Sequence, residues 1–257
     1  MRSRNVMGRS RRWRRRVIAL AVAAAFGGEL ARGEPSSPVV INGQVGFARQ
    51  GKELTITNTP GAIIQWRSFS IAKDEVTRFV QQSAASKVLN RVSGVDPSLI
   101  LGTLQSNGRV YLINPNGIVF GAGAQIDTAG LIASTLHLSN EDFLAGRLRF
   151  AETPGAGNLS NQGKINASGG PVYLVAPNVE NSGVITAPGG EIILAAGKSV
   201  QLVDPQSPDV RIEVTAPANQ ALNVGSLIAE RGHVGIYAGM IRNGGTIRAN
   251  SAVLNEK

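Results

Sequence analysis

A 20-residue repeat in the second half of the chain constrains the fold more than any other feature. The unit reads N-x-G-x-I-x-A-x-G-G-x-(V/I)-x-L-x-A; it begins at Asn161 and returns without a gap at Asn181. Further units begin at Asn223 and Asn243, which are again 20 residues apart. Repeats of this length are typical of a solenoid, in which each unit buries its apolar face against the unit before it.

The apolar residues inside each unit alternate with polar or small residues. In the first three units Val, Ile or Leu occupies positions +4, +11 and +13 after the asparagine, as at Ile165, Val172 and Leu174. This period-2 alternation indicates strands with one buried face, and glycine and proline recur too often for helices. The sequence therefore predicts an all-β chain that folds as a right-handed parallel β-helix with about 20 residues per coil.

Asparagine and glycine recur where each coil must turn. The asparagines open the units, and a glycine pair follows at positions +8 and +9. We expect tight corners at these residues, because glycine adopts positive φ at low cost and asparagine tolerates that region and bonds to its neighbours. The predicted corner residues are Asn161, Asn181, Asn223, Asn243, Gly169, Gly170, Gly189 and Gly190.

The spacing slips once within the repeats, because Asn223 follows Asn181 by 42 residues. Residues 198–203 and 209–215 have strand-like sequences on either side of the proline-rich stretch 204–208. This segment is either a divergent coil or an extra-helical hairpin that leans on the coil, and we favour the hairpin.

The N-terminal half lacks the regular repeat but has the pattern of strands and turns. Strands are predicted at residues 53–57, 62–66 and 69–71. One short helix is predicted between Ser139, which suits an N-cap, and Gly146, which suits a C-terminal stop.

A coil of small apolar residues gains about as much free energy from burial as it loses in chain entropy, so it is unstable without a neighbour. The first coil therefore needs a cap, after which later coils can add in sequence order. Trp66, Phe69 and Phe79 are expected to pack in the core of this N-terminal cap.

The first thirty or so residues differ from the rest in charge and hydropathy. Eight arginines lie within the first 16 residues, ahead of the apolar run 17–26. That run would span only about 15 Å as a helix, and it predicts a secretory signal peptide in residues 1–31. From residue 32 onward 18 basic and 16 acidic residues remain, so the formal charge of +9 falls to +2. This balance excludes a nucleic-acid-binding surface in the body of the protein.

The sequence shows no arrangement for catalysis, a metal or a cofactor. It has no cysteine and only His137 and His233, without metal-ligand spacing. The enzymatic alternative is a polysaccharide-degrading β-helix, which needs acidic residues clustered with Arg or Lys on one strand face. The charged residues of the repeats that we compared share no register; they are Lys164, Glu180, Glu191, Lys198 and Glu230. We therefore expect a protein that is not an enzyme and has no catalytic residue, metal or cofactor.

The sequence Asn114-Pro115-Asn116-Gly117, followed by Ile118, predicts a β-turn between two strands. Proline at the second turn position, asparagine at the first and third, and glycine at the last all suit such a turn. The turn is either a plain corner of the solenoid or a surface that a partner grasps, for example by pairing with the flanking strand.

A series of ordered motifs lies between residues 39 and 150. They are I-x-W at 64–66, F-S-I at 69–71, F-x-Q at 79–81, L-N-R-V-x-G at 89–94, S-x-I-x-G-x-L at 98–104, N-G-x-V at 107–110, L-I-N-P-N-G-I-x-F-G at 112–121 and G-L-x-A-S-T at 130–135. Together they closely resemble the two-partner secretion domain, which opens filamentous haemagglutinins, high-molecular-weight adhesins and contact-dependent inhibition proteins. A second motif typical of the filamentous haemagglutinin type, Asn-Pro-Asn-Leu, is absent upstream, so the chain is more similar to the high-molecular-weight adhesin type.

The resemblance implies how the chain is organised and what it does. A secretion β-helix would occupy residues 32–257, with a cap at 32–70, early coils at 71–150 and regular coils at 151–257. The domain would direct a large exported protein through the general export machinery and the periplasm to an outer-membrane β-barrel transporter. The POTRA modules of that transporter would recognise the domain while it is extended, and folding would follow outside the Gram-negative cell, in the medium or at the cell surface.

The resemblance also implies a role in folding, an alternative function and the residues that the transporter recognises. Folding of this domain would nucleate folding of a downstream passenger portion if the natural chain is longer. The alternative function is that of an adhesin, which would act directly on host cells or glycans. The residues implied in partner recognition are Asn114, Pro115, Asn116, Gly117 and Ile118, together with Asn90 and Arg91, which either touch the partner or form a structural ion pair.

Overall fold

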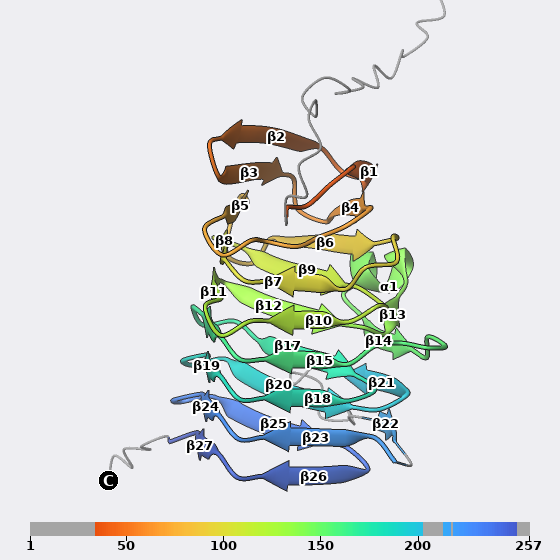
Figure 1. Cartoon of the computed structure of the whole chain (residues 1–257), viewed down its shortest axis with the longest axis vertical. Coiled ribbons are helices and arrows are strands. Elements are labelled where there is room, and N and C mark those ends of the chain that lie inside the picture. The colour runs from red at the N-terminus through yellow and green to blue at the C-terminus, as the bar shows by residue number, and fades with distance from the viewer. Residues whose placement is uncertain (1–33, 203–212, 217, 251–257) are drawn as a thin grey trace, which may run out of the picture. The chain divides into compact units, whose positions relative to one another are not determined.

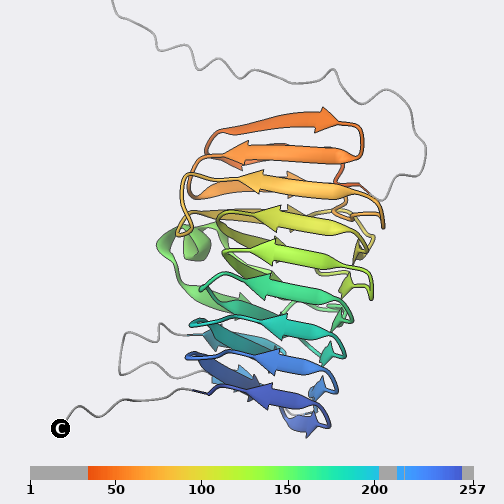
Figure 2. The same cartoon turned by 90° about the vertical axis from the view of Figure 1, so that its left-hand side faces the viewer.

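A computed structural model describes residues 34–202, 213–216 and 218–250. The chain winds into a stack of coils, and the colours of Figure 1 follow the stack from one end to the other in sequence order. Each regular coil contributes one strand to each of three sheets, which we call sheets 1, 2 and 3 (Figures 1 and 2). The prediction of an all-β parallel β-helix is therefore confirmed.

Sheet 1 has eight strands and sheet 2 has nine. In order, sheet 1 contains β1 (Val39–Asn42), β4 (Ala62–Trp66), β6 (Lys87–Val92), β9 (Arg109–Ile113), β12 (Gly130–Ser134), β17 (Val172–Ala176), β20 (Glu191–Ala196) and β25 (His233–Tyr237). Sheet 2 contains β2 (Val45–Gln50), β3 (Glu53–Asn58), β5 (Val76–Val80), β8 (Thr103–Ser106), β11 (Gln125–Thr128), β16 (Lys164–Ala167), β19 (Val184–Thr186), β24 (Ser226–Ile228) and β27 (Thr246–Arg248).

Sheet 3 has six strands and closes the coil. The pairs within the three sheets are parallel, except that β1 pairs antiparallel with β4 and β2 pairs antiparallel with β3. These antiparallel strands cover the N-terminal end of the stack. The strands of sheet 3 are β7 (Ser98–Ile100), β10 (Ile118–Phe120), β15 (Leu159–Asn161), β18 (Val179–Asn181), β23 (Gln220–Asn223) and β26 (Met240–Asn243).

The apolar columns of the repeat line the interior between the sheets. Ile165 pairs with Ile185, and Ile185 pairs with Leu227, so the +4 position of each unit lies directly over that of the unit before it. All three side chains are fully buried. Val234 and Ile236, in the third unit, are only partly buried against the same core. Repeated burial of this kind stabilises each coil by several kcal/mol, at about 1.5–3 kcal/mol per apolar side chain.

The predicted cap aromatics pack on one another at the N-terminal end of this core. The ring centroids of Trp66 and Phe69 are 5.5 Å apart, and those of Phe69 and Phe79 are 6.5 Å apart. Each of the three side chains is 1% exposed. Residues 69–71 differ from the prediction of a strand, because only Ile71 reaches a neighbouring strand, in a single bridge to Ile100.

Two insertions leave the coil at the same corner, after a strand of sheet 1 and before a strand of sheet 3. The first contains β13 (His137–Leu138), α1 (Asn140–Ala145) and β14 (Leu148–Ala151), and the second contains β21 (Ser199–Leu202) and β22 (Glu213–Thr215). Together they form a four-stranded antiparallel sheet in the order β13-β14-β21-β22. The favoured extra-helical hairpin is thus present as β21 and β22, although its proline-rich centre lies outside the described residues.

The inserted sheet packs against the outer face of sheet 1 and creates a second apolar core. Phe143 of α1 meets the ring of Tyr111 at 5.0 Å, edge to face, and both side chains are buried. The helix begins and ends where predicted: the Ser139 hydroxyl accepts a hydrogen bond from the Asp142 amide, and Gly146 adopts φ 74°.

The glycine pairs serve the corners for two different reasons. Gly169 and Gly189, the first of each pair, have φ of 88° and 68°, which glycine tolerates. The second of each pair is needed because the coils approach closely: a Cβ on Gly190 would lie 2.2 Å from the carbonyl oxygen of Gly170. In the third unit Arg231 replaces the first glycine and keeps φ at 59°.

The four corner asparagines do not use the left-handed backbone that the sequence suggested for them. Each is the last residue of a strand of sheet 3, and the positive-φ non-glycine residues of the described chain are Ser37 and Arg231. Their side chains instead bond from coil to coil. The amide groups of Asn161, Asn181, Asn223 and Asn243 form a continuous ladder with N···O distances of 2.7–2.8 Å.

Candidate functional site

The Asn114–Gly117 segment forms the turn that joins β9 to β10. The Gly117 amide donates to the Asn114 carbonyl oxygen at 3.2 Å, which closes a β-turn, and Gly117 has φ of 120°. The Asn116 amide donates to Asn114 Oδ1 at 3.0 Å. This side-chain bond reinforces the turn, as asparagine commonly does.

Asn114 fastens the turn to the coil before it. Its side-chain nitrogen donates to the carbonyl oxygen of Asp96 at 3.0 Å and to the hydroxyl of Ser98 at 2.9 Å. Asn114 is fully buried, so its polar atoms are inaccessible to a partner of the folded domain. A buried amide with all these bonds is costly to remove, because its partners would be left without replacements.

Only the tip of the motif reaches the surface. Asn116 is exposed and Pro115 is half-buried, whereas Gly117 and Ile118 are buried. The Asn116 side chain donates to the carbonyl oxygen of Gly94 at 2.8 Å, a bond that water can replace.

Asn90 and Arg91 lie on β6, next to the strand that leads into the turn; Arg91 pairs in register with Ile113. Asn90 is fully buried, accepts a hydrogen bond from the Trp66 indole at 3.0 Å and donates to the Tyr111 carbonyl at 3.2 Å. In the described chain Asn90 therefore joins the cap to the next coil, and its side chain is inaccessible to a partner of the folded domain.

Arg91 holds the start of α1. Its guanidinium donates to Asn140 Oδ1 at 2.6 Å and to the Leu138 carbonyl at 2.5 Å. The expected alternative of a structural ion pair is wrong for the described chain, since both partners are neutral oxygens. Burial lowers the pKa of Arg91 from its usual value, which is consistent with a cation that has no carboxylate beside it.

Lys87 holds the other end of the same helix, and no motif in the sequence singled it out. Its ammonium donates to the Phe143 carbonyl and lies 4.8 Å from the centre of the Phe143 ring. Burial, and then the nearby Arg109, lower its pKa. Lys87 and Arg91 are four residues apart on one face of β6, so one strand clamps both ends of α1.

The structure offers little for catalysis at the histidines. His137 and His233 are exposed, on β13 and β25. Burial, followed by the charge of Arg91, lowers the pKa of His137. Within residues 34–202, 213–216 and 218–250, no three His, Cys, Asp or Glu side chains gather as a metal site would require. In the same ranges no helix has the length and apolar character to cross a membrane.

The structure is a parallel β-helix with an antiparallel cap and an Asn-Pro-Asn-Gly turn between sheets 1 and 3, an architecture that it shares with a solved secretion domain. The family model of the TPS secretion domain matches residues 31–257. The chain belongs to this family and is a secretion-targeting domain of an exported protein. The family is a secretion domain rather than a catalytic one, and it implies secretion from a Gram-negative bacterium through a partner transporter in the outer membrane.

Relatives and solved structures agree with this membership. The chain is similar to a heme/hemopexin-binding protein of Haemophilus influenzae, with 34% identity over 163 residues, which cover 59% of this chain and 18% of the relative. The chain thus matches less than a fifth of that relative's length. A second heme/hemopexin-binding protein of Haemophilus influenzae shares 44% identity over 77 residues, covering 30% of this chain and 8% of its own.

Two solved structures share the fold. The HMW1 secretion domain from Haemophilus influenzae superposes with a TM-score of 0.80 and 37% identity, covering 85% of this chain and 60% of that one. The filamentous hemagglutinin secretion domain superposes with a TM-score of 0.54 and 17% identity, covering 84% of this chain and 98% of that one. The second likeness extends to the fold alone.

Proposed function

We propose that residues 32–257 deliver an exported protein to an outer-membrane β-barrel transporter whose POTRA modules bind the Asn114–Ile118 motif before the domain folds. Residues 1–31 serve as the signal peptide that takes the chain through the general export machinery into the periplasm. The described β-helix then forms outside the cell.

The observation that carries this proposal is the burial of the motif. Asn114, Gly117 and Ile118 are buried in the folded domain, and the side-chain nitrogen of Asn114 donates its hydrogen bonds to the neighbouring coil. A partner that reads the whole motif must therefore meet it while the chain is extended. An extended strand can add to the edge of a partner sheet, with backbone bonds for affinity and side chains for specificity.

The fold also supports an ordered assembly after transport. The antiparallel strands and the aromatic cluster around Phe69 close the N-terminal end of the stack. Each later coil extends columns and an asparagine ladder that the coil before it has begun. Folding from the cap would thus proceed in the order of export and template any passenger portion that follows.

The test is secretion of an Asn116→Ala variant co-expressed with the cognate transporter. Asn116 is exposed and its one coil-to-coil bond can be replaced by water, so the variant should fold normally while less of it reaches the medium. Asn178→Ala is the matched control, because Asn178 is a half-exposed corner asparagine that donates to Asn158 of the preceding coil and accepts from the Gln220 amide of the following one. Equal secretion of both variants and of the original chain would contradict recognition of the motif.

A binding experiment separates recognition of the extended chain from recognition of the folded domain. Isolated POTRA modules should bind the original chain freshly diluted from urea, before Asn114, Gly117 and Ile118 become buried, more tightly than the same chain after refolding. Tighter binding to the folded chain would overturn the order of events proposed here.

A further inference from the structure

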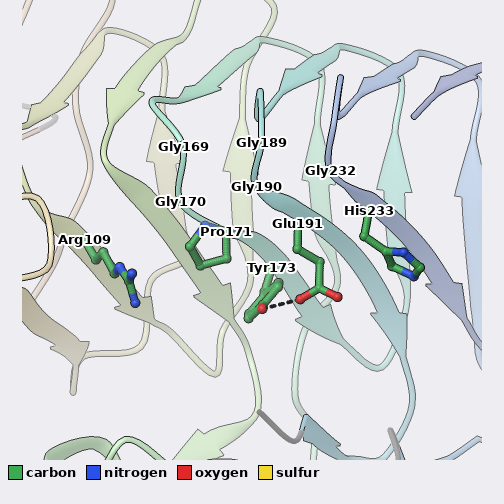
Figure 3. Close-up of a pocket in the computed structure, with 10 residues that line it drawn as sticks. All are labelled: Arg109, Gly169, Gly170, Pro171, Tyr173, Gly189, Gly190, Glu191, Gly232 and His233. Atoms are coloured by element: carbon green, nitrogen blue, oxygen red, sulfur yellow. Dashed lines mark hydrogen bonds between the residues drawn. The ribbon is translucent and has the colours of Figure 1, made fainter. Parts of the chain in front are cut away.

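A groove runs along the outer face of sheet 1, at the edge where its strands begin. Two adjoining hollows of about 620 and 490 Å³ make it up, and they share Arg109, Pro171, Tyr173 and Glu191 as walls. Figure 3 shows Arg109, then Pro171 and Tyr173, then Glu191 along this edge of the sheet. None of them belongs to the turn proposed for transporter recognition.

The register of sheet 1 brings charged residues from distant coils into one column. Lys87 pairs with Arg109, and Glu191 pairs with His233. Between these pairs the strands of β12 and β17 begin at Gly130 and just after Pro171. At about 4.8 Å per strand, the six positions span about 24 Å. The groove is therefore about 24 Å long, which suits a linear polymer.

Positive charge dominates the part of the groove nearest the inserted sheet. Lys87, Arg109, Arg147 and Arg149 line it, against the single acidic side chain of Glu191 among its described walls. Arg147 is neutralised by Glu141 and Asp142, and Lys87 is turned toward α1.

Arg109 has the most unusual environment of these cations. Within the described residues no carboxylate lies within salt-bridge distance of it, and its Nε is buried without a hydrogen-bond partner. Arg109 lines both hollows and its charge has no carboxylate partner among the described residues, so it is the residue to which an anionic group in the groove would bind.

The groove also contains acceptors and an apolar surface. The Tyr173 hydroxyl donates to Glu191 Oε2 at 2.5 Å, as drawn in Figure 3. Burial and this bond raise the pKa of Tyr173, so it stays a neutral donor. Beside them lie the ring of Pro171 and bare backbone at Gly189, where a Cβ would meet no atom within 4 Å.

A ligand for this groove must be anionic in part and must donate hydrogen bonds elsewhere. A sugar chain with acidic substituents meets both needs, because its hydroxyl groups donate to carboxylates and its ring faces pack on apolar side chains. A phosphodiester chain fits less well, because it offers few hydrogen-bond donors to Glu191.

We propose that this groove binds a linear oligosaccharide carrying carboxylate or sulfate groups, with one such group on Arg109 and neighbouring hydroxyls on Glu191 and Tyr173. The described walls provide one carboxylate, Glu191, and not the pair that glycoside hydrolysis needs, so binding is the role assigned to the groove. This activity is separate from secretion targeting and would belong to the folded domain outside the cell.

Calorimetric titration of the purified full chain tests the proposal. The probes are a decasaccharide of polygalacturonate, a heparin decasaccharide and a neutral malto-oligosaccharide of the same length. At least one acidic probe should bind at least about tenfold more tightly than the neutral one, and the comparison of the two tells carboxylate from sulfate. Absence of binding by both acidic probes at millimolar concentration would overturn the proposal.

Single substitutions test whether the acidic probe binds in this groove. Arg109→Gln should weaken binding of the acidic probe about tenfold or more, whereas Lys164→Gln, which removes the same charge from the exposed face of sheet 2, should leave it unchanged. Glu191→Gln keeps an acceptor for Tyr173 and should bind the probe as tightly or more tightly. Thermal unfolding of each variant shows that it is folded. Equal weakening by Arg109→Gln and Lys164→Gln, or tighter binding of a ten-nucleotide oligothymidylate than of either acidic glycan, would refute the site.

Discussion

The side-chain nitrogen of Asn181 donates to Asn223 Oδ1 over 2.8 Å, the same distance that separates Asn161 from Asn181. Yet 42 residues separate the first pair and 20 the second. The extra residues leave the coil as β21 and β22 and return to the same corner. The hydrogen bond between successive ladder asparagines is therefore the same with and without an insertion between them. The domain can thus carry insertions on one side of the coil while its core stays regular.

The ladder should contribute measurably to stability. Asn181→Ala leaves the side-chain nitrogen of Asn161 and the side-chain oxygen of Asn223 without their partners in a buried place. Each unsatisfied buried group costs about 1–3 kcal/mol, so we expect the free energy of unfolding to fall by about 2–4 kcal/mol. Urea unfolding followed by circular dichroism measures this change.

A control asparagine in the same coil separates the ladder from a general effect of asparagine loss. Asn178 bonds to both neighbouring coils, donating to Asn158 and accepting from the Gln220 amide, but it is half-exposed, so water can reach the groups that Asn178→Ala leaves without a partner. That variant should lose less than about 1 kcal/mol. Equal losses for Asn181→Ala and Asn178→Ala would show that burial of the ladder has no special role.

Two adjacent glycines should respond differently to the same substitution. In Gly189→Ala the new methyl group contacts no atom within 4 Å, so the only cost is the left-handed backbone conformation. We expect the free energy of unfolding to fall by about 1 kcal/mol. Gly190→Ala places a methyl group 2.2 Å from the carbonyl oxygen of Gly170, so the coils must separate, at about 3 kcal/mol. Urea unfolding of both variants gives the comparison, and the reverse ranking would mean that coil spacing adapts more easily than backbone conformation.

The repeat made much of the fold predictable. Because Ile165, Ile185 and Leu227 recur at one position of the unit, the sequence alone indicated a stacked column, and the structure contains it. The ends of the short helix were equally predictable, since Ser139 and Gly146 act through bonds to nearby residues.

Contacts between coils of unequal length could not be read from the sequence. The pairing of β14 with β21 joins segments about fifty residues apart that share no repeat. The column that contains Lys87, Arg109 and Glu191 spans both the irregular early coils and the regular ones, so no fixed spacing reveals it. The sequence also suggested an ionic partner for Arg91, because it does not show that neutral oxygens of the α1 insertion would face that side chain.

Alanine substitutions at Asn114 and Asn116 should distinguish an effect on stability from an effect on secretion. Asn114→Ala removes a buried amide from Asp96 and Ser98 and should lower the free energy of unfolding by about 2–4 kcal/mol. Asn116→Ala should change it by less than about 1 kcal/mol, because its bond to Gly94 is exposed. Urea unfolding of purified variants checks both values. If Asn116→Ala were as destabilising as Asn114→Ala, a secretion defect in the former would reflect folding and not recognition.

The first turn of α1 should make the domain less stable in acid. The Arg147 guanidinium, bonded to Asp142 Oδ1 at 2.6 Å, and then the Ser139 hydroxyl hold the pKa of Asp142 below its ordinary value of 3.8. Below that value the unfolded chain binds more protons than the folded one, so this contribution is full above pH 3.8 and is lost as pH falls through the folded pKa. Asp142→Asn should therefore flatten the loss of stability in urea unfolding between about pH 5 and pH 2.5. Glu180→Gln, on the exposed face of β18, controls for net charge, and an acid profile of Asp142→Asn that matched this control would refute the assignment.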